Sequence, residues 1–242
     1  MHARLSDGTT LAICRYEPFE SHDPHAHDGT SISFVLAGGV AEQVRGVTRR
    51  GCGLDTVVKP SGTEHANRFG PSGALLVQIG LGRTSSPAPW FWAPTLAPDR
   101  WLILTRVLLS PTRQCRLSEA FAGVTASFGN HPRAPAPEWL HDAQEEIRNA
   151  PHAQVRDLAA RHGLHEVTFA REFRKHFRVS PRELRVRGRV SHAMELLWKQ
   201  PHRPLASVAA ACGFADQPHM NRGFRAVLGM RPTEFVDLVG GI

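Results

Sequence analysis

The sequence predicts a two-domain α+β protein. An antiparallel β-barrel or jelly roll and a helix pair precede an all-α domain with two helix-turn-helix motifs joined by a linker helix. Short apolar runs broken by glycine, proline, aspartate and serine fill residues 1–82, which is typical of small antiparallel barrels. Beyond residue 98, apolar residues recur every three or four positions, as in amphipathic helices. The third observation is an internal repeat at an offset of 50–51 residues within the helical part. The 242 residues are enough for two domains that each bury a core.

The charge of the chain favours a polyanionic partner. The net charge is +7, which by itself would suit a nucleic acid or an anionic membrane surface equally well. Residues 161–189 hold nine Arg or Lys against three Glu, and this run lies on and beside a predicted helix-turn-helix motif. A run of charge is often only a solvated face, but this position favours contacts with phosphate groups.

The sequence gives no sign of a membrane segment or of an oxidising compartment. The first ten residues have no apolar core, and no run approaches the roughly 18 apolar residues of a membrane span. The four cysteines have no close spacing; they are Cys14, Cys52, Cys115 and Cys212. We therefore expect a cytoplasmic protein.

The β part is expected to contain five main strands, at residues 11–13, 31–36, 40–47, 54–58 and 74–81. The Pro- and Ser-rich residues 83–98 are expected to form a loop, whose aromatic residues Trp90, Phe91 and Trp92 close the barrel or pack on a helix. Helices over 101–109 and 117–128 complete a first domain of residues 1–128. A proline-rich linker spans residues 129–137, where proline fixes φ and removes hydrogen-bond donors.

Three histidines are candidate metal ligands. His25 and His27 are two residues apart, so on one strand they would share a face, and a facing strand would bring His65 beside them. Three neutral imidazoles suit Zn²⁺, Ni²⁺, Cu²⁺ or Fe²⁺ and leave an open coordination position. Glu64 would point away from His65 on a strand, which leaves Glu42 as the better fourth ligand. Two alternatives stay open: an effector pocket without metal, and histidines with a purely structural role.

The second copy of the internal repeat has the pattern of a helix-turn-helix motif. A short helix around residues 208–211 precedes Gly213, which accepts the positive φ of a tight turn. Asp216 is a candidate cap of the next helix, and Pro218 fits its first turn, where no N–H is needed. Apolar residues then recur at intervals of three or four residues, at Met220, Phe224 and Val227 or Leu228.

The first copy has the same pattern over residues 158–184. Its second helix, expected over residues 165–177, buries Phe169, Phe173 and Phe177. Between the copies, residues 181–199 are expected to form one helix of about 28 Å, at about 1.5 Å per residue. That length can place two recognition helices about one turn of B-DNA apart on the same face of a duplex.

Within a C-terminal domain of residues 138–242, the chain resembles the DNA-binding domain of the AraC/XylS family of bacterial transcription regulators. The residues that carry the resemblance are Gly213-Phe214-Ala215-Asp216-Gln217, His219, Arg222, Phe224, Gly229, Pro232 and Phe235. The chain departs from the family pattern at Pro218, where serine is frequent, and at Gly188 and Gly223, each of which costs a helix about 1 kcal/mol relative to alanine. Residues 25–27 and 60–67 resemble the two motifs of the cupin family, a common sensory domain of such regulators.

The resemblance implies which residues contact DNA. The residues facing base edges would be Val167, Ala170 and Arg171 in the first motif, with Thr168 beside them, and Gln217, Pro218, His219, Asn221 and Arg222 in the second. Arginine can pair with guanine, and Gln or Asn with adenine. Long cationic side chains at the helix rim suit phosphates better; these are Arg174, Lys175, Arg178, Arg185 and Arg225.

The sequence therefore predicts a sequence-specific DNA-binding transcription regulator, not an enzyme, whose cupin-like domain senses a small molecule or a metal. The expected partners are double-stranded promoter DNA, an unidentified effector, RNA polymerase and a second copy of the chain. One alternative is a metal-dependent cupin enzyme, a dioxygenase or isomerase, tethered to a DNA-binding domain. The other is a nucleoid-binding protein with weak sequence preference.

Overall fold

A computed structural model describes residues 2–82, 90–95, 97–110, 115–126, 136–149 and 154–242. Its N-terminal part is one sheet in which every strand pairing is antiparallel, as the sequence predicts. The path through the sheet is β1-β2-β7-β4-β6-β8, with β3 paired to β7 and β5 to β4. The strands are β1 (His2–Arg4), β2 (Thr10–Tyr16), β3 (Ser21–His25), β4 (Ser31–Val44), β5 (Val47–Cys52), β6 (Asp55–Lys59), β7 (His65–Gly80) and β8 (Phe91–Pro94).

The strands differ from the prediction in several ways. Strands β1, β3 and nearly all of β5 lie outside the predicted ranges, and β7 begins nine residues before the strand predicted at 74–81. The strands expected at 31–36 and 40–47 are largely one strand, β4, which bends at register shifts on either side of Ala37 and Gly38. Gly38 has φ +74°, and a Cβ there would lie 2.2 Å from the carbonyl oxygen of Gly73, so the bend requires glycine. Part of the loop expected at 83–98 is strand β8, which pairs with β6 and places the Trp92 ring over Gly51.

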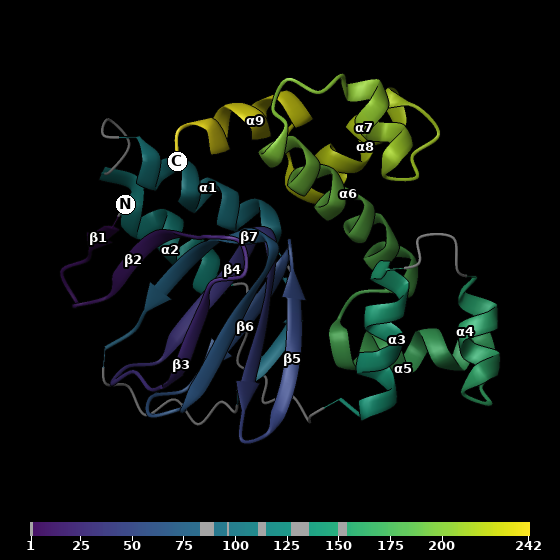
Figure 1. Ribbon diagram of the computed structural model, residues 1–242, viewed down its shortest axis with the longest axis horizontal. Helices are drawn as coiled ribbons and strands as arrows, with labels where there is room; N and C mark the ends of the chain where they lie inside the picture. The colour runs from purple at the N-terminus through teal and green to yellow at the C-terminus, as the bar shows by residue number, and fades with distance from the viewer. Residues whose placement is uncertain (1, 83–89, 96, 111–114, 127–135, 150–153) are drawn as a thin grey trace.

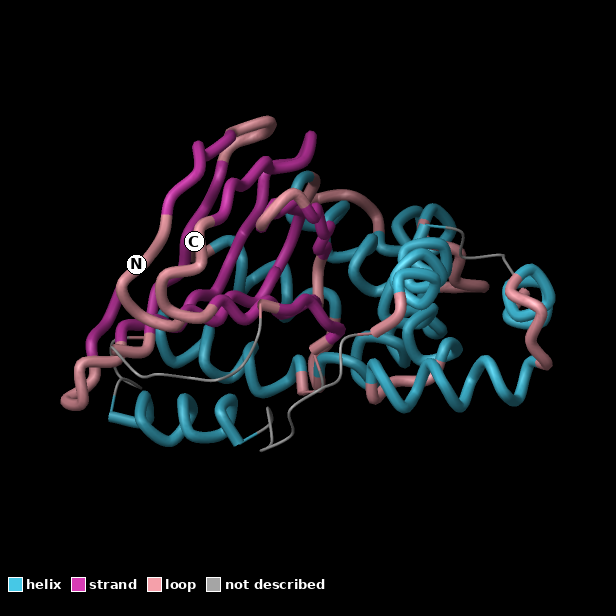
Figure 2. The backbone as a smooth tube through the Cα atoms, turned by 90° about the horizontal axis from the view of Figure 1, so that it is seen from below, coloured by secondary structure: helices cyan, strands magenta, loops and turns pink. Residues whose placement is uncertain are grey.

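The sheet has two buried faces. One is covered by α1 (Pro98–Leu109) and α2 (Leu117–Ala126), with Trp101 of α1 stacked on Phe34 at a centroid distance of 5.2 Å. The other face encloses the apolar interior formed by Val35, Val40, Val57, Phe69, Ala74, Leu76 and Trp92. Figure 1 shows the sheet beside the helical part, and Figure 2 shows it from below.

The C-terminal part is helical, and α6 is its central element (Figure 1). The helices are α3 (Glu138–Asn149), α4 (Val155–Arg161), α5 (Glu166–Phe177), α6 (Pro181–Lys199), α7 (Leu205–Ala211), α8 (Gln217–Leu228) and α9 (Pro232–Gly240). The predicted bounds of the helices at 138–149 and 181–199 are confirmed by α3 and α6. A capping box between Ser180 and Glu183, with Pro181 in the first turn, fixes the start of α6.

Packing explains one of the two helical glycines, Gly223, but not Gly188. A Cβ at Gly223 would lie 3.1 Å from the Phe214 ring and 3.5 Å from Val190. A Cβ at Gly188 would lie 3.5 Å from the backbone of Arg148 in α3. The cost in helix propensity is therefore accompanied by tight packing at Gly223, whereas at Gly188 a Cβ would make an ordinary van der Waals contact.

The helical part contributes to two separate apolar cores. The first helical unit, α3 to α5 with the start of α6, has its own core, formed by Leu140, Ala143, Ile147, Leu158, Ala159, Phe169, Phe173, Phe177, Val179 and Leu184. The second helical unit, α7 to α9 with the rest of α6, shares one continuous core with α1, α2 and one face of the sheet. The predicted linker at 129–137 lies mostly outside the described residues. Among the described helices, none has an apolar stretch sufficient to span a bilayer.

Candidate DNA interface and candidate metal centre

The recognition helix of the second unit is α8, and its local structure follows the predicted pattern. The carboxylate of Asp216 accepts a hydrogen bond from the backbone N–H of His219 at 2.6 Å, which caps the helix. Pro218 lies in the first turn, and Gly229 ends the helix with φ 67°. Met220, Phe224 and Leu228 are buried. These contacts fix which side of α8 faces outward.

Helix α5 is the matching element of the first unit. Its cap is the His165 ring, which accepts a hydrogen bond from the backbone N–H of Val167 at 3.3 Å. Phe169, Phe173 and Phe177 are buried at the positions that correspond to Met220, Phe224 and Leu228. Both helices have 12 residues and end in a left-handed residue, Arg178 in α5 and Gly229 in α8. The repeat in the sequence is therefore also a repeat in structure.

The structure leaves the predicted DNA-contacting side chains accessible to different degrees. The exposed residues are Val167, Arg171, Arg174, Lys175, Arg178, Pro218, Arg222 and Arg225. The half-buried residues are Thr168, Ala170, Arg185, Gln217, His219 and Asn221. Positions i, i+4 and i+7 form one outward stripe on each helix, with Val167, Arg171 and Arg174 on α5 and Pro218, Arg222 and Arg225 on α8. Both stripes thus end in two exposed arginines.

Glutamates neighbour several of these cations, a feature that sequence reasoning did not include. Glu172 lies 3.9 Å from Arg171 and 3.4 Å from Lys175, and Glu183 lies 4.0 Å from Arg174. The three cationic side chains are 68–73% exposed, so each pair contributes at most about 1 kcal/mol. Such pairs are weak enough to be replaced by phosphate contacts.

Two residues of α8 that are predicted to contact bases, His219 and Asn221, have surroundings within the motif that the sequence did not reveal. The Nδ1 atom of His219 accepts a hydrogen bond from the backbone N–H of Ala215 at 3.2 Å, and its ring lies edge-on to Phe214. His219 therefore helps to hold the turn. The Oδ1 atom of Asn221 is buried and has no hydrogen-bond partner among the described residues.

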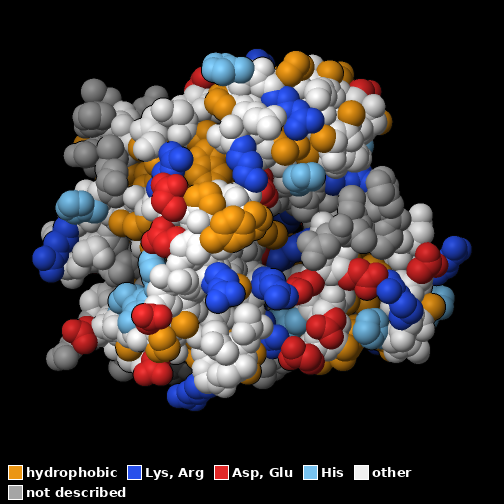
Figure 3. Space-filling model, viewed as in Figure 1, with side chains coloured by type: hydrophobic (Ala, Val, Ile, Leu, Met, Phe, Trp, Pro, Cys, Tyr) orange, Lys and Arg blue, Asp and Glu red, His pale blue; other side chains and the backbone are white. Residues whose placement is uncertain are grey.

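The acidic side of the helical part is a poor surface for DNA. Helix α3 carries Glu138, Asp142, Glu145 and Glu146. Figure 3 shows acidic side chains gathered over the region of α3 and α4. Because this charge would repel phosphate groups, a duplex is better accommodated on the surfaces that carry the arginine stripes.

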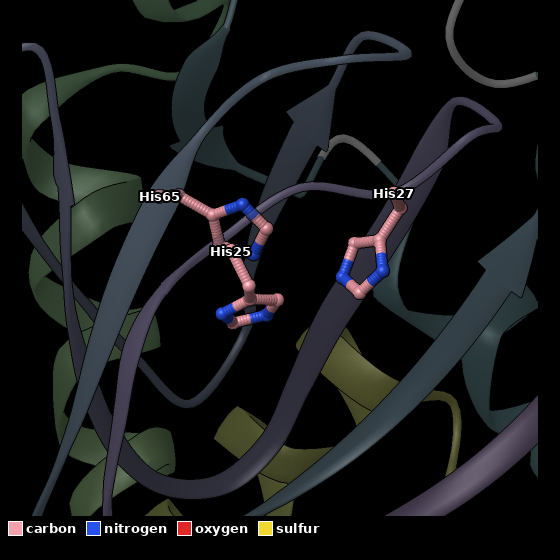
Figure 4. A group of neighbouring side chains, drawn as sticks. All are labelled: His25, His27 and His65. Atoms are coloured by element: carbon pink, nitrogen blue, oxygen red, sulfur yellow. The ribbon is translucent and has the colours of Figure 1, made fainter.

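The three predicted histidines come together in the β part. Register pairing of β3 with β7 places His25 opposite His65, and His27 lies just beyond β3. The expectation that His25 and His27 share one strand is therefore wrong, although both rings reach the same place. One ring nitrogen from each of the three histidines lies within 4.8 Å of the others. Figure 4 shows the three rings grouped in this way.

Backbone carbonyls fix the proton positions on two of the histidines. The Nδ1–H of His25 donates to the carbonyl oxygen of Asp23 at 2.7 Å, and that of His65 donates to the carbonyl oxygen of Thr63 at 2.9 Å. A carbonyl oxygen only accepts, so the Nε2 atoms keep their lone pairs, as in metal-ligating histidines. The Nε2 atom of His65 is buried and lacks a hydrogen-bond partner among the described residues.

Burial and a nearby cation favour the neutral form of His65 and His27. Burial, with a smaller contribution from Lys59, lowers the pKa of His65 to about 4. The same two causes lower the pKa of His27. Neutral imidazoles are the form that binds metal, so the donor set fits a divalent ion that accepts nitrogen ligands.

Glu42, the predicted fourth ligand, has other partners. Its Oε2 atom accepts from Lys59 Nζ at 2.9 Å, and its Oε1 atom accepts from Trp90 Nε1 at 2.5 Å. Glu42 is absent from the group of described residues whose ligand atoms gather. Sequence reasoning missed Lys59 and did not link Trp90 to Glu42, although a lysine at the end of an apolar strand was a usable signal. The buried pair is better described as a neighbour of the histidines than as part of their ligand set.

Comparison with known proteins supports the assignment of the C-terminal part. The family described as "Helix-turn-helix domain" matches residues 158–237. The probable transcriptional regulator LumQ of Photobacterium leiognathi is 30% identical over 81 residues, which cover 34% of this chain and 32% of that protein. The match therefore spans about a third of the curated relative. The predicted resemblance to AraC/XylS regulators is confirmed for this region.

Several solved structures are similar over other extents. ToxT of Vibrio cholerae aligns over 95% of this chain and 98% of its own, with 11% identity and a TM-score of 0.41. A ToxT structure with bound unsaturated fatty acid gives 12% identity and a TM-score of 0.41, over 100% of this chain and 99% of that one. Oxalate decarboxylase of Bacillus subtilis, a protein with Mn(II) centres, aligns over 36% of this chain and 24% of its own, with 18% identity and a TM-score of 0.30. Such low TM-scores assign no function.

Proposed function

We propose that this protein is a cytoplasmic transcription regulator that binds specific DNA sequences through α5 and α8 and senses a small molecule or a metal in its β domain. The observation that carries the proposal is the structural repeat of a helix-turn-helix motif with two exposed arginines in the same stripe of each recognition helix. Helix α6 has 19 residues between the motifs, about 28 Å at about 1.5 Å per residue. That spacing suits successive major grooves on one face of a duplex.

The β domain is proposed to hold one divalent ion, Zn²⁺, Ni²⁺, Cu²⁺ or Fe²⁺, on His25, His27 and His65. The fixed tautomers of two ligands and the unpaired Nε2 atom of His65 support this donor set. When bound, the ion would offer open coordination positions to an effector. The alternative within the same domain is an organic effector that hydrogen-bonds to these histidines without metal.

Coupling between the β domain and DNA is proposed to act through α3 and α6. Arg148 of α3 pairs with Asp55, and Arg187 of α6 donates to the carbonyl oxygen of Thr95. A ligand changes DNA binding only if its affinity differs between the competent and incompetent arrangements. RNA polymerase and a second copy of the chain are proposed as further partners. The buried side of α1 packs within the monomer, so a homodimer would use other residues.

Salt dependence of DNA binding tests the phosphate contacts. Five cations are proposed to contact phosphates, so the slope of log K against log salt concentration is expected to be about −4 to −5. The measurement uses the full chain and a duplex selected from a randomised library. A slope near zero would exclude the phosphate-contact surface.

Matched arginine variants test sequence specificity. Arg222→Ala is expected to cost about 1–3 kcal/mol of binding free energy on the selected site and much less on random DNA. Arg225→Ala, the control from the same stripe, is expected to weaken binding to both duplexes equally. Equal losses for Arg222→Ala on the two duplexes would make it another phosphate contact.

The enzyme alternative makes a separate prediction about metal. A metal-dependent dioxygenase or isomerase requires stoichiometric metal in the purified full-length protein, measured by elemental analysis. Protein without metal that still selects a DNA sequence would support a regulator that senses an organic effector. A His65→Ala variant, compared with the wild type, assigns any bound metal to this site.

A further inference from the structure

We infer that the two recognition helices contact chemically different bases: α5 contacts thymine methyl groups through Val167, and α8 contacts adenine through the amide of Asn221. This inference rests on the proposed function, since it requires that both helices enter major grooves. It adds the chemical class of each half of the DNA site, which the motif alone does not determine.

The structure makes the two helices comparable position by position. Both have 12 residues, and their buried residues match at an offset of 51. Val167 therefore corresponds to Pro218, and Ala170 to Asn221. The arginines of the two stripes are identical, so they give both helices similar contacts, and a difference in base preference has to arise from the N-terminal turns. In helix-turn-helix proteins these turns contact the base edges.

On α5 the exposed group is an aliphatic side chain. Val167 is 69% exposed, so it adds little to the core of the first helical unit. A β-branched residue is also slightly unfavourable in a helix, so local folding does not explain its place. Thr168 and Ala170 beside it each carry a methyl group. An apolar surface of this kind matches the C5-methyl group of thymine, which projects into the major groove.

On α8 the equivalent surface carries an amide. The Oδ1 atom of Asn221 is buried without a hydrogen-bond partner among the described residues, a state that proteins avoid. If the side chain turns outward onto adenine, the N6 amino group supplies the missing donor, and the amide nitrogen donates to N7. Ala170, at the matching position of α5, has no polar side-chain atom to offer. The second half of the site is therefore expected to contain an adenine.

Single-atom changes in the DNA test both contacts. The full-length protein first selects a site from a randomised duplex library. In the selected site, each thymine is then replaced by uracil, which removes only the methyl group, and each adenine by 7-deaza-adenine, which removes only the N7 acceptor. Dissociation constants are measured for the wild type and for Val167→Ala, Pro218→Ala and Asn221→Ala. Val47→Ala is a control for an exposed valine elsewhere, since Val47 is 44% exposed on β5.

Uracil at one or two positions of one half-site is expected to weaken wild-type binding about fourfold, the effect of about one buried methyl group. This sensitivity is expected to vanish in Val167→Ala and to persist in Pro218→Ala and Val47→Ala. One 7-deaza-adenine in the other half-site is expected to weaken binding about tenfold, except in Asn221→Ala.

Two results would overturn the inference while leaving the proposed function intact. In one, a sequence is enriched but uracil sensitivity remains in Val167→Ala or is lost in Pro218→Ala. In the other, sensitivity to 7-deaza-adenine is the same in Asn221→Ala as in the wild type. A library that yields no enriched sequence would instead contradict sequence-specific DNA binding itself.

Discussion

The two helical units have nearly the same internal structure but are attached to the sheet in different ways. The first unit keeps a core of its own, and ion pairs such as Arg148–Asp55 and Arg49–Glu138 join it to the sheet. The second unit shares its core with α1, α2 and the sheet. One recognition helix is thus held against the β domain by ion pairs, and the other by continuous apolar packing.

The central polar contact of the first unit is a buried ion pair. The Arg148 guanidinium donates two hydrogen bonds of 2.5 Å to Asp55, and the side chains are 8% and 3% exposed. Burial raises the pKa of the Asp55 carboxyl, and Arg148 opposes that shift. A second pair joins Arg49 to Glu138 at 2.8 and 3.0 Å, with Glu138 70% exposed.

The difference indicates how a signal could reach one motif before the other. A buried ion pair depends on precise geometry, because both charges have lost their hydration and only their mutual attraction offsets that desolvation penalty. A shift of β6, the strand that carries Asp55, would therefore weaken this contact between the first unit and the sheet. In the second unit, apolar packing continues from α8 into α1. This unit is therefore expected to move together with α1 and α2.

The largest expected effects come from truncating equivalent phenylalanines in the two cores. Phe173→Ala and Phe224→Ala each remove a fully buried ring and are expected to cost about 3–5 kcal/mol of unfolding free energy. Hydrogen exchange is expected to show lost amide protection mainly in α3–α5 for Phe173→Ala, and also in α1 for Phe224→Ala. Equal loss in α1 for both variants would contradict the separation of the two cores.

Breaking the buried ion pair is expected to have the next largest effect. Asp55→Asn leaves Arg148 buried without a counter-charge and is expected to destabilise docking of the first unit by about 3 kcal/mol. The double variant Asp55→Leu with Arg148→Met, an apolar pair, is expected to recover most of this loss.

The control for that comparison is the exposed pair. Glu138→Gln is expected to cost less than about 1 kcal/mol, because Glu138 is largely solvated. Urea unfolding together with amide exchange in α3 measures all three changes. A cost for Glu138→Gln as large as that for Asp55→Asn would remove the distinction between the two pairs.

A further expected effect is a dependence of the stability of the first unit on pH. Burial lowers the pKa of His141 in α3 to about 4. This value includes smaller lowering effects of Arg49 and Arg148 and opposing effects of Glu138 and Asp142. The ring centroids of His141 and Phe177 are 5.6 Å apart. An unfolded histidine has a pKa of about 6.5, so the unfolded state binds more protons between these values. The stability of the first unit is therefore expected to fall as pH drops from about 6.5 towards 4.

The variant His141→Gln isolates this contribution from that of the other histidines. Its unfolding free energy, measured with urea through amide exchange in α3–α5, is expected to change less between pH 7 and pH 5 than that of the wild type. The same pH dependence in both proteins would show that His141 is solvated in the folded state.

Local signals were sufficient for the helices. Helix α6 was predicted to the residue, and the structure shows that Ser180, Pro181 and Glu183 mark its start within a few positions. The buried faces of α5 and α8 followed from apolar residues every four positions. In the β part, the bend in β4 and the existence of β8 were missed, because a strand is defined by partners far away in the sequence.

In the candidate sites, too, features set by local sequence could be predicted, whereas contacts between distant residues could not. Convergence of His25 and His65 could be expected from facing strands, but the engagement of Glu42 by Lys59 and Trp90 could not, since these residues come together only in the folded sheet. The arginine stripes followed from helical periodicity. Two features could be seen only in the tertiary structure. The Oδ1 atom of Asn221 has no hydrogen-bond partner among the described residues, and glutamates lie beside the exposed cations.

By itself the sequence determined the elements whose causes are local: the helix caps, the buried stripes and the repeat that gives two similar recognition helices. Only the tertiary structure decided how those helices are attached to the β domain. Asp55 and Arg148 are 93 residues apart in the chain, and no nearby pattern marks either as the partner of the other. Burial away from water makes that contact energetically decisive, and burial is a property of the packed chain rather than of any segment.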